Sequence, residues 1–218
     1  MIKLPKIRNN MERLDPDPRR FCKKCRVEND YTVDLFEDIK AGVIGCKFAY
    51  FYKNFFISSG TDSAVFKHEN NKNVIKIYPY LDSKKVTLYS NEIDRVSQEL
   101  SGKRKLVGRN YNFVFVPIDN IVTNEFGNGC TMVISRNIEF PNFTEYRREH
   151  PSTPDLLIPI ENMFTKYYKK RALTISRKLT RRFDLNDMNF KLDDKTNTIY
   201  FTDIASSISV FLHIYVGI

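Results

Sequence analysis

The alternation of hydrophobic and polar residues predicts short strands in the first third of the chain. Phe48–Phe56 is a strongly aromatic run, and Ala64–Lys67 and Val74–Tyr78 are two further apolar runs. Small or polar residues separate them at Ile57–Ser63 and Glu69–Asn73. Apolar runs bounded by such residues are typical of strands joined by tight turns. We therefore expect an antiparallel meander in this region.

Two later stretches have the periodicity of amphipathic helices. In residues 88–100 and 164–179, apolar residues recur every three or four positions, and the second stretch carries basic residues on its other face. Short β-rich runs predict strands at 112–116 and 131–135. Residues 190–201 predict a hairpin, because two apolar runs flank a polar turn there.

The order of these elements divides the chain into three parts. Residues 1–47 read as a basic N-terminal extension or cap, 48–136 as a lobe of strands with one helix, and 137–218 as a smaller, mainly helical lobe. Strands followed by helices indicate the α+β class, with the change of character near residues 136–155. The apolar run at 208–218 predicts a buried element that closes the small lobe, with a homodimer contact as the alternative.

Composition narrows the class of protein and its partners. The 218 residues carry a net charge of +9, which favours acidic partners such as nucleotides, phosphorylated proteins, nucleic acid or an anionic membrane surface. No apolar run approaches the roughly 20 residues of a membrane span, and the N-terminus lacks a signal-peptide pattern. An intracellular location is therefore expected. The chain is rich in Asn, Lys, Ile, Tyr and Phe and has no Trp, a bias typical of AT-rich coding sequence, as in a large DNA virus or a parasite.

The cysteines suggest thiols in a reducing compartment. Cys22 and Cys25 have the spacing of half a zinc site, and the only plausible further ligands are Cys46 and His68. Cys130 stands apart from them. Ordinary thiols are the favoured interpretation, and a structural zinc site is the alternative.

Polar residues suited to phosphoryl transfer follow one another along the chain. Asp184 precedes Asn189 by five residues, and Asp203 ends the second apolar run of the predicted hairpin. Upstream, Lys76 lies in an apolar run and Glu92 lies in the first predicted helix. This series resembles the protein kinase family, in which a lysine strand and a helix glutamate precede the motifs H-R-D-L-x-x-x-N and D-F-G.

The resemblance implies a bilobal kinase-like fold that binds ATP and Mg²⁺. Lys76 would neutralise the α- and β-phosphates with Glu92 as its partner, and Glu99 is the alternative partner. Val133 and Ser135 would lie on the strand that leads to the hinge, where backbone groups hold the adenine. Small residues would form the phosphate-binding loop over the nucleotide, namely Ser58, Ser59, Gly60, Thr61, Ser63 and Val65.

The same resemblance assigns roles in the smaller lobe, which would hold the catalytic-loop-like and metal-binding segments. Asp184 would accept the proton of the attacking hydroxyl or orient it. Asn189 and Asp203 would hold magnesium through side-chain oxygens. The chain departs from the family pattern at Arg182 and Phe183, which replace the histidine and arginine before the catalytic aspartate, and no A-P-E segment follows.

These observations leave three functions open. The first is a minimal atypical kinase that transfers the γ-phosphate of Mg-ATP to a hydroxyl, with protein Ser/Thr as the expected acceptor. The second is a pseudokinase or truncated kinase mimic, of a type that a virus would encode, that binds and regulates a host kinase or another partner. The third is a basic nucleic-acid-binding protein, because Tyr167 and Tyr168 are interleaved with a run of cations that consists of Lys166, Lys169, Lys170, Arg171, Arg177, Lys178, Arg181 and Arg182. The same run would also suit docking of an acidic protein substrate.

Overall fold

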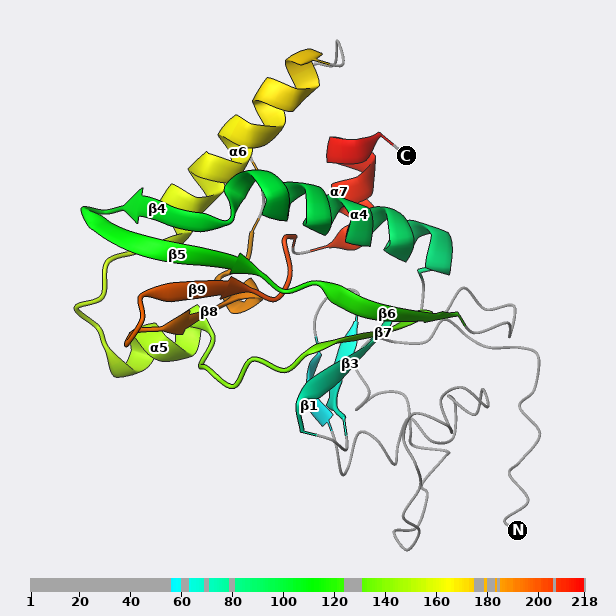
Figure 1. The fold of residues 1–218 in the computed structure, drawn as a ribbon, viewed down its shortest axis with the longest axis horizontal. Coiled ribbons are helices and arrows are strands. Elements are labelled where there is room, and N and C mark those ends of the chain that lie inside the picture. Colours follow the sequence, from blue (N-terminus) through cyan, green and yellow to red (C-terminus); the bar gives the residue numbers. More distant parts are fainter. Residues whose placement is uncertain are drawn as a thin grey trace, which may run out of the picture. The chain divides into compact units, whose positions relative to one another are not determined.

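The protein is a mixed α+β chain that forms two compact units (Figure 1). The computed structural model describes residues 56–59, 63–68, 71–78, 81–123, 131–174, 179, 183, 185–205 and 207–217. The first unit draws on Met1–Thr87 and Ile118–Asn137, and the second on Leu88–Pro117 and Ile138–Ile218. The α+β class expected from the sequence is confirmed. The division differs from a single boundary at residue 136, because Leu88–Pro117 belongs to the second unit.

Several features singled out in the sequence lie outside the described residues and stay predictions. They are the extension at 1–47, nearly all of the aromatic run at 48–56, the four cysteines, the loop residues Gly60 and Thr61, and the candidate base Asp184.

The first unit is built on a five-stranded antiparallel sheet with the order β1-β2-β3-β7-β6. Its strands are β1 (Phe56–Ser59), β2 (Ala64–Lys67), β3 (Asn73–Tyr78), β6 (Ile118–Thr123) and β7 (Thr131–Arg136). Two of the three predicted strands of the meander are confirmed as β2 and β3. The first was expected at 48–56, whereas β1 begins at Phe56 and continues into the residues expected to form a turn. The strand β6 was not predicted, because its run Ile-Asp-Asn-Ile-Val-Thr has no clean alternation.

The turn was predicted at 57–63, but the first residues of that stretch belong to a strand. Residues Ser58 and Ser59 belong to β1 and pair with Val65 and Ala64 of β2. Because ladder pairing extends this far, the connection between the two strands is reduced to residues 60–63.

The second unit contains a four-stranded sheet with the order β4-β5-β9-β8. Its strands are β4 (Gly102–Leu106), β5 (Arg109–Phe115), β8 (Phe190–Asp193) and β9 (Thr198–Phe201). Strand β5 runs parallel to β9, and the other pairs are antiparallel. The predicted hairpin at 190–201 is confirmed. The segment expected to form a mainly helical lobe, 137–218, is joined in this unit by β4 and β5, which come from earlier in the chain and complete a sheet around this hairpin.

The described helices are α4 (Ser83–Leu100), α5 (Phe143–Glu149), α6 (Leu157–Thr174) and α7 (Ile208–Phe211). A π turn at Leu212–Val216 continues α7, and a 3₁₀ turn occupies Asp187–Asn189. The two predicted helices exist but begin earlier than the periodicity indicated. The short helix α5 was missed, although Asn142 and Glu145 form a capping box at its start. None of the helices in the described part of the chain is long and apolar enough to cross a membrane.

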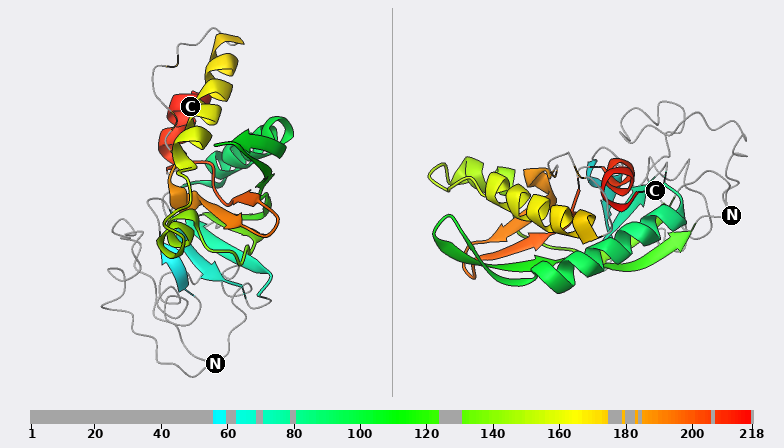
Figure 2. Two further views of the ribbon diagram at one scale, coloured as in Figure 1. Left: turned by 90° about the vertical axis from the view of Figure 1, so that its left-hand side faces the viewer. Right: turned by 90° about the horizontal axis from the view of Figure 1, so that it is seen from above.

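Aromatic rings form the core of the second unit. Helix α6 packs on one face of the sheet, where Phe164 makes edge contacts with Phe115 and Phe201 (Figure 2). Phe164 also stacks on Phe183 with ring centroids 4.7 Å apart. In the closing segment, buried side chains are contributed by Ile208, Phe211, Leu212 and Tyr215. The prediction of a buried element at the C-terminal run is therefore confirmed.

Candidate functional site

In the first unit, the residues predicted for the nucleotide site form a row across the sheet. Ser58 pairs with Val65, Val65 pairs with Lys76, and Lys76 pairs with Val133. Directly opposite residues in antiparallel strands project to the same face of a sheet. The register therefore places these four side chains side by side on one face, although they come from four different strands. We call them the cross-strand row.

Burial changes along the cross-strand row. Val133 is fully buried, whereas Ser58, Val65 and Lys76 are half-buried. Ser135 lies two residues beyond Val133 on the same face and is also buried. One end of the row is therefore a buried apolar side chain, Val133, and the ammonium group of Lys76 lies next to it. That combination suits a ligand with one apolar and one anionic part.

In the second unit, the hairpin β8–β9 brings the two candidate metal ligands together. The backbone amides of Thr202 and Asp203 donate to the carbonyl oxygen of Asn189 at 2.9 Å and 3.3 Å, and the Thr202 hydroxyl donates to the same oxygen at 3.0 Å. The Asn189 side-chain amide nitrogen donates to the carbonyl of Ala205 at 2.8 Å. Asn189 and Asp203 are therefore held next to each other by the backbone at the end of the hairpin.

The atoms at this position fit a hard cation. Because the amide nitrogen of Asn189 binds Ala205, its oxygen Oδ1 is the atom directed to other partners. The carboxylate oxygen Oδ1 of Asp203 accepts the Ile204 amide at 3.0 Å, and carboxylate oxygens have further lone pairs for a ligand. Magnesium is commonly bound by one or two protein oxygens together with substrate phosphates and water. The pair of side chains is consistent with such a partial site.

The segment before Asn189 is anchored to α6 on both sides of residue 184. The amide of Phe183 donates to the Thr165 hydroxyl at 3.0 Å, and the amide of Leu185 donates to the Glu161 carboxylate at 3.4 Å. Phe183 and Leu185 are both buried. The residues immediately before and after Asp184 in the sequence are therefore held by hydrogen bonds to α6. In the sequence, Phe183 stands out only as a departure from the kinase pattern, and no local signal indicates its place in the core.

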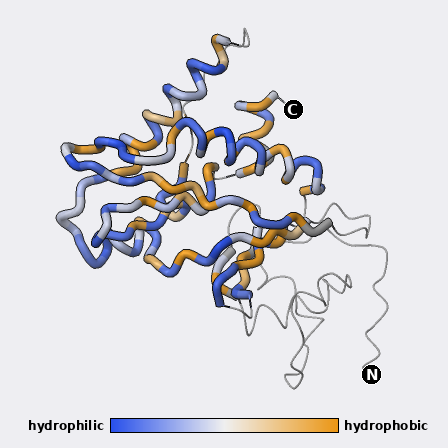
Figure 3. The backbone as a smooth tube through the Cα atoms, in the orientation of Figure 1, coloured by the Kyte–Doolittle hydropathy of each residue, from blue (hydrophilic) through white to orange (hydrophobic). Residues whose placement is uncertain are grey.

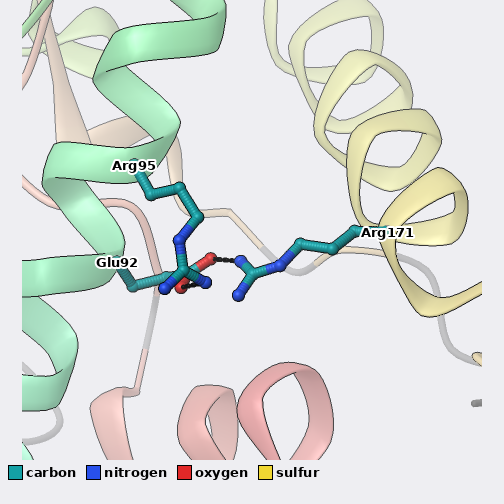
Figure 4. A network of polar contacts seen from close by, with 3 residues as sticks. All are labelled: Glu92, Arg95 and Arg171. Atoms are coloured by element: carbon teal, nitrogen blue, oxygen red, sulfur yellow. Dashed lines mark hydrogen bonds and ion pairs between the residues drawn. The ribbon is translucent and has the colours of Figure 1, made fainter. Parts of the chain in front are cut away.

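Glu92 lies in α4, and its carboxylate is only 2% exposed and joined to two arginines (Figure 4). One carboxylate oxygen accepts from Arg95, one turn later in the same helix, at 3.0 Å. The other oxygen accepts from Arg171 of α6. Burial raises the pKa of Glu92 above its ordinary value, and the hydrogen bond from Arg95 opposes that shift. These three residues, the glutamate cluster, connect α4 to α6.

The glutamate cluster changes how the predicted Lys76–Glu92 pair is understood. The ion-pair partners described for Glu92 are arginines of the second unit, whereas Lys76 belongs to the first unit. The pairing with Lys76 stays a prediction. Sequence analysis counted Arg171 only as part of a basic run, because its partner lies 79 residues away along the chain.

Helix α4 also contacts the turn that carries Asp203. The backbone amide of Ile204 donates to the Tyr89 hydroxyl at 3.0 Å, within the buried interior. Tyr89 and Glu92 lie three residues apart on α4, so one helix face supports both features. Sequence analysis did not single out Tyr89, since a tyrosine on an amphipathic helix is ordinary in a core.

The tyrosines of the basic run are not available for stacking on a nucleic acid. Tyr167 is 7% exposed and Tyr168 is 2% exposed. Tyr168 packs against Phe183, Phe211 and Tyr215. Burial, together with the charge of Glu92, raises the pKa of Tyr167 to about 12. Tyr168 lies on the buried side of α6 with Phe164 and Ala172, as the apolar periodicity of this stretch predicts, and Tyr167 is buried as well.

The cations of α6 itself do lie on the surface. Lys166, Lys169 and Lys170 are exposed, whereas Arg171 is partly buried in the glutamate cluster. The other members of the basic run lie outside the described residues. A solvated helix face accounts for the three lysines.

Within the part of the chain that the structure describes, no three or more His, Cys, Asp or Glu side chains gather into a group that would hold a metal ion. The candidate cation position is the Asn189–Asp203 pair, which combines an amide with one carboxylate. Comparison of the sequence with models of known protein families and with curated proteins gives no match.

Proposed function

We propose that this protein is a minimal, kinase-like phosphotransferase that transfers the γ-phosphate of Mg-ATP to a hydroxyl group. The observation that carries the proposal is the backbone link between Asn189 and Asp203, which holds an amide and a carboxylate together at the end of the β8–β9 hairpin. Two such oxygen ligands following a candidate base, Asp184, are the polar groups that phosphoryl transfer uses.

The first unit supports the nucleotide part of the proposal. The cross-strand row aligns Ser58, Val65, Lys76 and Val133, each of which was assigned to the nucleotide on sequence grounds alone. The order of elements also agrees with the kinase-like interpretation, because three antiparallel strands lead into α4, which carries Glu92. In this interpretation Lys76 neutralises phosphate charge while Val133 lines the adenine.

The roles of the residues follow from their chemistry. The ammonium group of Lys76 would orient the α- and β-phosphates, and the oxygens of Asn189 and Asp203 would bind magnesium. Magnesium would offset the charge that builds up on the phosphoryl oxygens. Asp184 would accept the proton of the attacking hydroxyl. The net positive charge of the chain favours an acidic protein as the acceptor.

The test is thermal unfolding of the full chain with ATP, in the presence and absence of magnesium. Ligand at a hundred times its Kd adds about 2.7 kcal/mol to the free energy of unfolding, which is a shift of roughly 5–10 °C for a chain of this size. We expect a magnesium-dependent shift that Lys76→Ala and Asp203→Asn abolish. The matched control is Lys166→Ala, which removes an exposed lysine from α6 and should keep the shift. An equal shift in all four proteins would contradict the site.

The alternative is a pseudokinase that binds a partner without chemistry, and transfer separates the two. We expect radiolabelled γ-phosphate to reach an acidic acceptor such as casein, and Asp184→Asn to remove transfer while preserving the thermal shift with Mg-ATP. If the wild-type chain binds Mg-ATP without any transfer to casein or to itself, the pseudokinase interpretation replaces the proposal.

A further inference from the structure

The sheet of the second unit has one face that is separate from its aromatic core. Side chains alternate between the two faces along each strand. On β4 and β5, the core face carries Leu106, Tyr111, Phe113 and Phe115, which are all buried. The opposite face carries side chains that are all exposed or half-buried: Lys103, Lys105, Asn110, Asn112 and Val114. We call this second side the outer face.

The register groups these polar side chains closely. Lys103 is directly opposite Asn112, and Lys105 is directly opposite Asn110. Two lysines and two asparagines therefore form a compact block on the outer face of the β4–β5 hairpin. The hairpin is drawn largely in the colour of hydrophilic residues in Figure 3.

The block on β4 and β5 is cationic. The register places one carboxylate on the same face, that of Asp193, which is buried and accepts hydrogen bonds from the Lys195 amide and the Thr196 hydroxyl. No Asp or Glu occurs between Glu99 and Asp119, whereas that segment contains Lys103, Arg104, Lys105 and Arg109. Arg104 points to the other side and donates to the carbonyls of Glu99 and Leu100 at the end of α4, so its role is structural. The lysines of the outer face have no such structural task in the described contacts.

An aromatic pair lies on the same face. Tyr200 of β9 is opposite Val114 of β5 and is half-buried. Phe140 stacks on Tyr200 with ring centroids 5.6 Å apart and an interplanar angle of 13°. Phe140 is a large hydrophobic residue with 36% of its surface exposed. Next to this pair, the ammonium group of Lys191 donates to the carbonyl of Ile138 at 2.6 Å, which holds the strand-like segment before Phe140 against the sheet.

We propose that the outer face of this sheet binds single-stranded nucleic acid. Lysines on an exposed sheet surface attract a phosphate backbone, and an exposed aromatic ring gives an unpaired base a stacking partner. The asparagine side chains supply both donors and acceptors for base edges. A duplex keeps its bases stacked on one another, so a single strand suits Phe140 better.

An acidic protein is the alternative ligand for the outer face. The combination of lysines, asparagines and aromatic rings favours nucleic acid over an acidic protein. Charge alone would attract either partner. The rigid Phe140–Tyr200 stack beside lysines and amides adds the flat apolar surface that a base uses. This inference is independent of the phosphotransferase proposal, because no residue of the outer face belongs to the cross-strand row or to the Asn189–Asp203 pair.

The experiment is fluorescence anisotropy of the full chain with a labelled 12-nucleotide single strand, in RNA and in DNA form, over a series of salt concentrations. The variant Lys103→Glu/Lys105→Glu should weaken binding by at least tenfold. Because two phosphate contacts are lost, the slope of log K against log salt should fall by about 1.4 for a single strand. The variant Phe140→Ala should weaken binding roughly tenfold with little change in that slope.

The matched control is Lys166→Glu/Lys169→Glu on α6, which makes the same charge change on an exposed helix. We expect it to change the affinity by less than about threefold and to leave the slope of log K against log salt unchanged. Circular dichroism and melting confirm that each variant is folded, and Phe140→Tyr, which keeps the ring, should bind like the wild type. Equal losses in both charge variants, no binding by the wild type at about 50 mM salt, or equal competition by polyglutamate would each overturn the proposal.

Discussion

The glutamate cluster provides a sensitive test of the structure. When one of its ion pairs is removed, the loss in free energy of unfolding depends on how deeply the Glu92 carboxylate is buried. In the variant Arg171→Met, the carboxylate of Glu92, which is 2% exposed in the structure, loses its partner from α6. Removing one partner of a buried ion pair costs about 3–5 kcal/mol. We expect the lower end, about 3 kcal/mol, because Arg95 still donates to the same carboxylate.

Thermal and urea unfolding of the full chain measure this loss. A loss of about 3 kcal/mol corresponds to a fall in Tm of roughly 6–12 °C for a chain of this length. The matched control is Arg95→Met, whose side chain is 46% exposed and whose removal leaves the pair between helices intact. Arg95 binds the same buried carboxylate but is itself more exposed than Arg171, whose side chain is 26% exposed. Solvent screens its contribution more strongly, so Arg95→Met should lower Tm by less than Arg171→Met does.

The pH dependence identifies charge as the cause. Burial already raises the pKa of Glu92 above 4.5, and loss of Arg171 should raise it further. The folded protein then holds this proton more tightly than the unfolded chain does. The corresponding stability is present at low pH and is lost as the pH rises through the raised pKa. The deficit of Arg171→Met should therefore be smaller at about pH 5 than at about pH 7.5.

Two outcomes would refute this reasoning. A variant that melts within about 1 °C of the wild type would show that the buried pair contributes little. A deficit of equal size at both pH values would assign the loss to packing of the Arg171 side chain. The double variant Glu92→Gln/Arg171→Met removes the buried charge itself, so it should be more stable than Arg171→Met alone.

Three further substitutions test other parts of the second unit by melting and urea unfolding. Phe183→Ala should cost about 3–5 kcal/mol because the ring is 1% exposed among aromatic neighbours. The control Leu173→Ala, at a position 79% exposed, should change the stability by no more than about 0.5 kcal/mol. A small loss for Phe183→Ala would argue against the stacked core. Tyr89→Phe removes one of the two acceptors of the Ile204 amide, the other being the Asp203 carboxylate, and should cost about 1 kcal/mol. An unchanged Tm would mean that the carboxylate satisfies this amide by itself. Asn142→Ala removes the capping box of α5 and should cost about 1 kcal/mol, while Asn142→Asp, which can still cap, should be close to neutral.

The local patterns of the chain were sufficient for most of the first sheet. Ala64–Lys67 and Val74–Tyr78 were recognised as strands because apolar runs bounded by turn residues have few alternatives. The β8–β9 hairpin was recognised for the same reason. The strand β4 was missed, since Gly-Lys-Arg-Lys-Leu is mostly polar and becomes a strand by pairing with β5. Its sheet is completed by β9, which begins 83 residues after β5 ends, and no local pattern encodes that partner.

The candidate site likewise has features that the sequence predicted and features that depend on the tertiary structure. The sequence suggested Lys76, Val65 and Val133 individually, but only strand register shows that they form one row. The neighbourhood of Asn189 and Asp203 was inferred from a hairpin between them, and the backbone hydrogen bonds now support it. The partners of Glu92 were not predictable, because an arginine in a basic run carries no sign of which carboxylate it will meet.

Local patterns in the sequence were enough to predict the α+β class, two strands of the meander, the closing hairpin and residue types suited to phosphate and magnesium. These depend on short-range periodicity and on the chemistry of single side chains, both of which are local. The burial of Tyr167 and the cationic face on β4 and β5 follow from the tertiary structure, whereas the apolar periodicity had already placed Tyr168 on the inner side of its helix. Burial depends on which distant segments cover a side chain: here Phe183, Phe211 and Tyr215 enclose Tyr168. Long-range packing, and not the local pattern, therefore decided which charged surfaces remain open to a ligand.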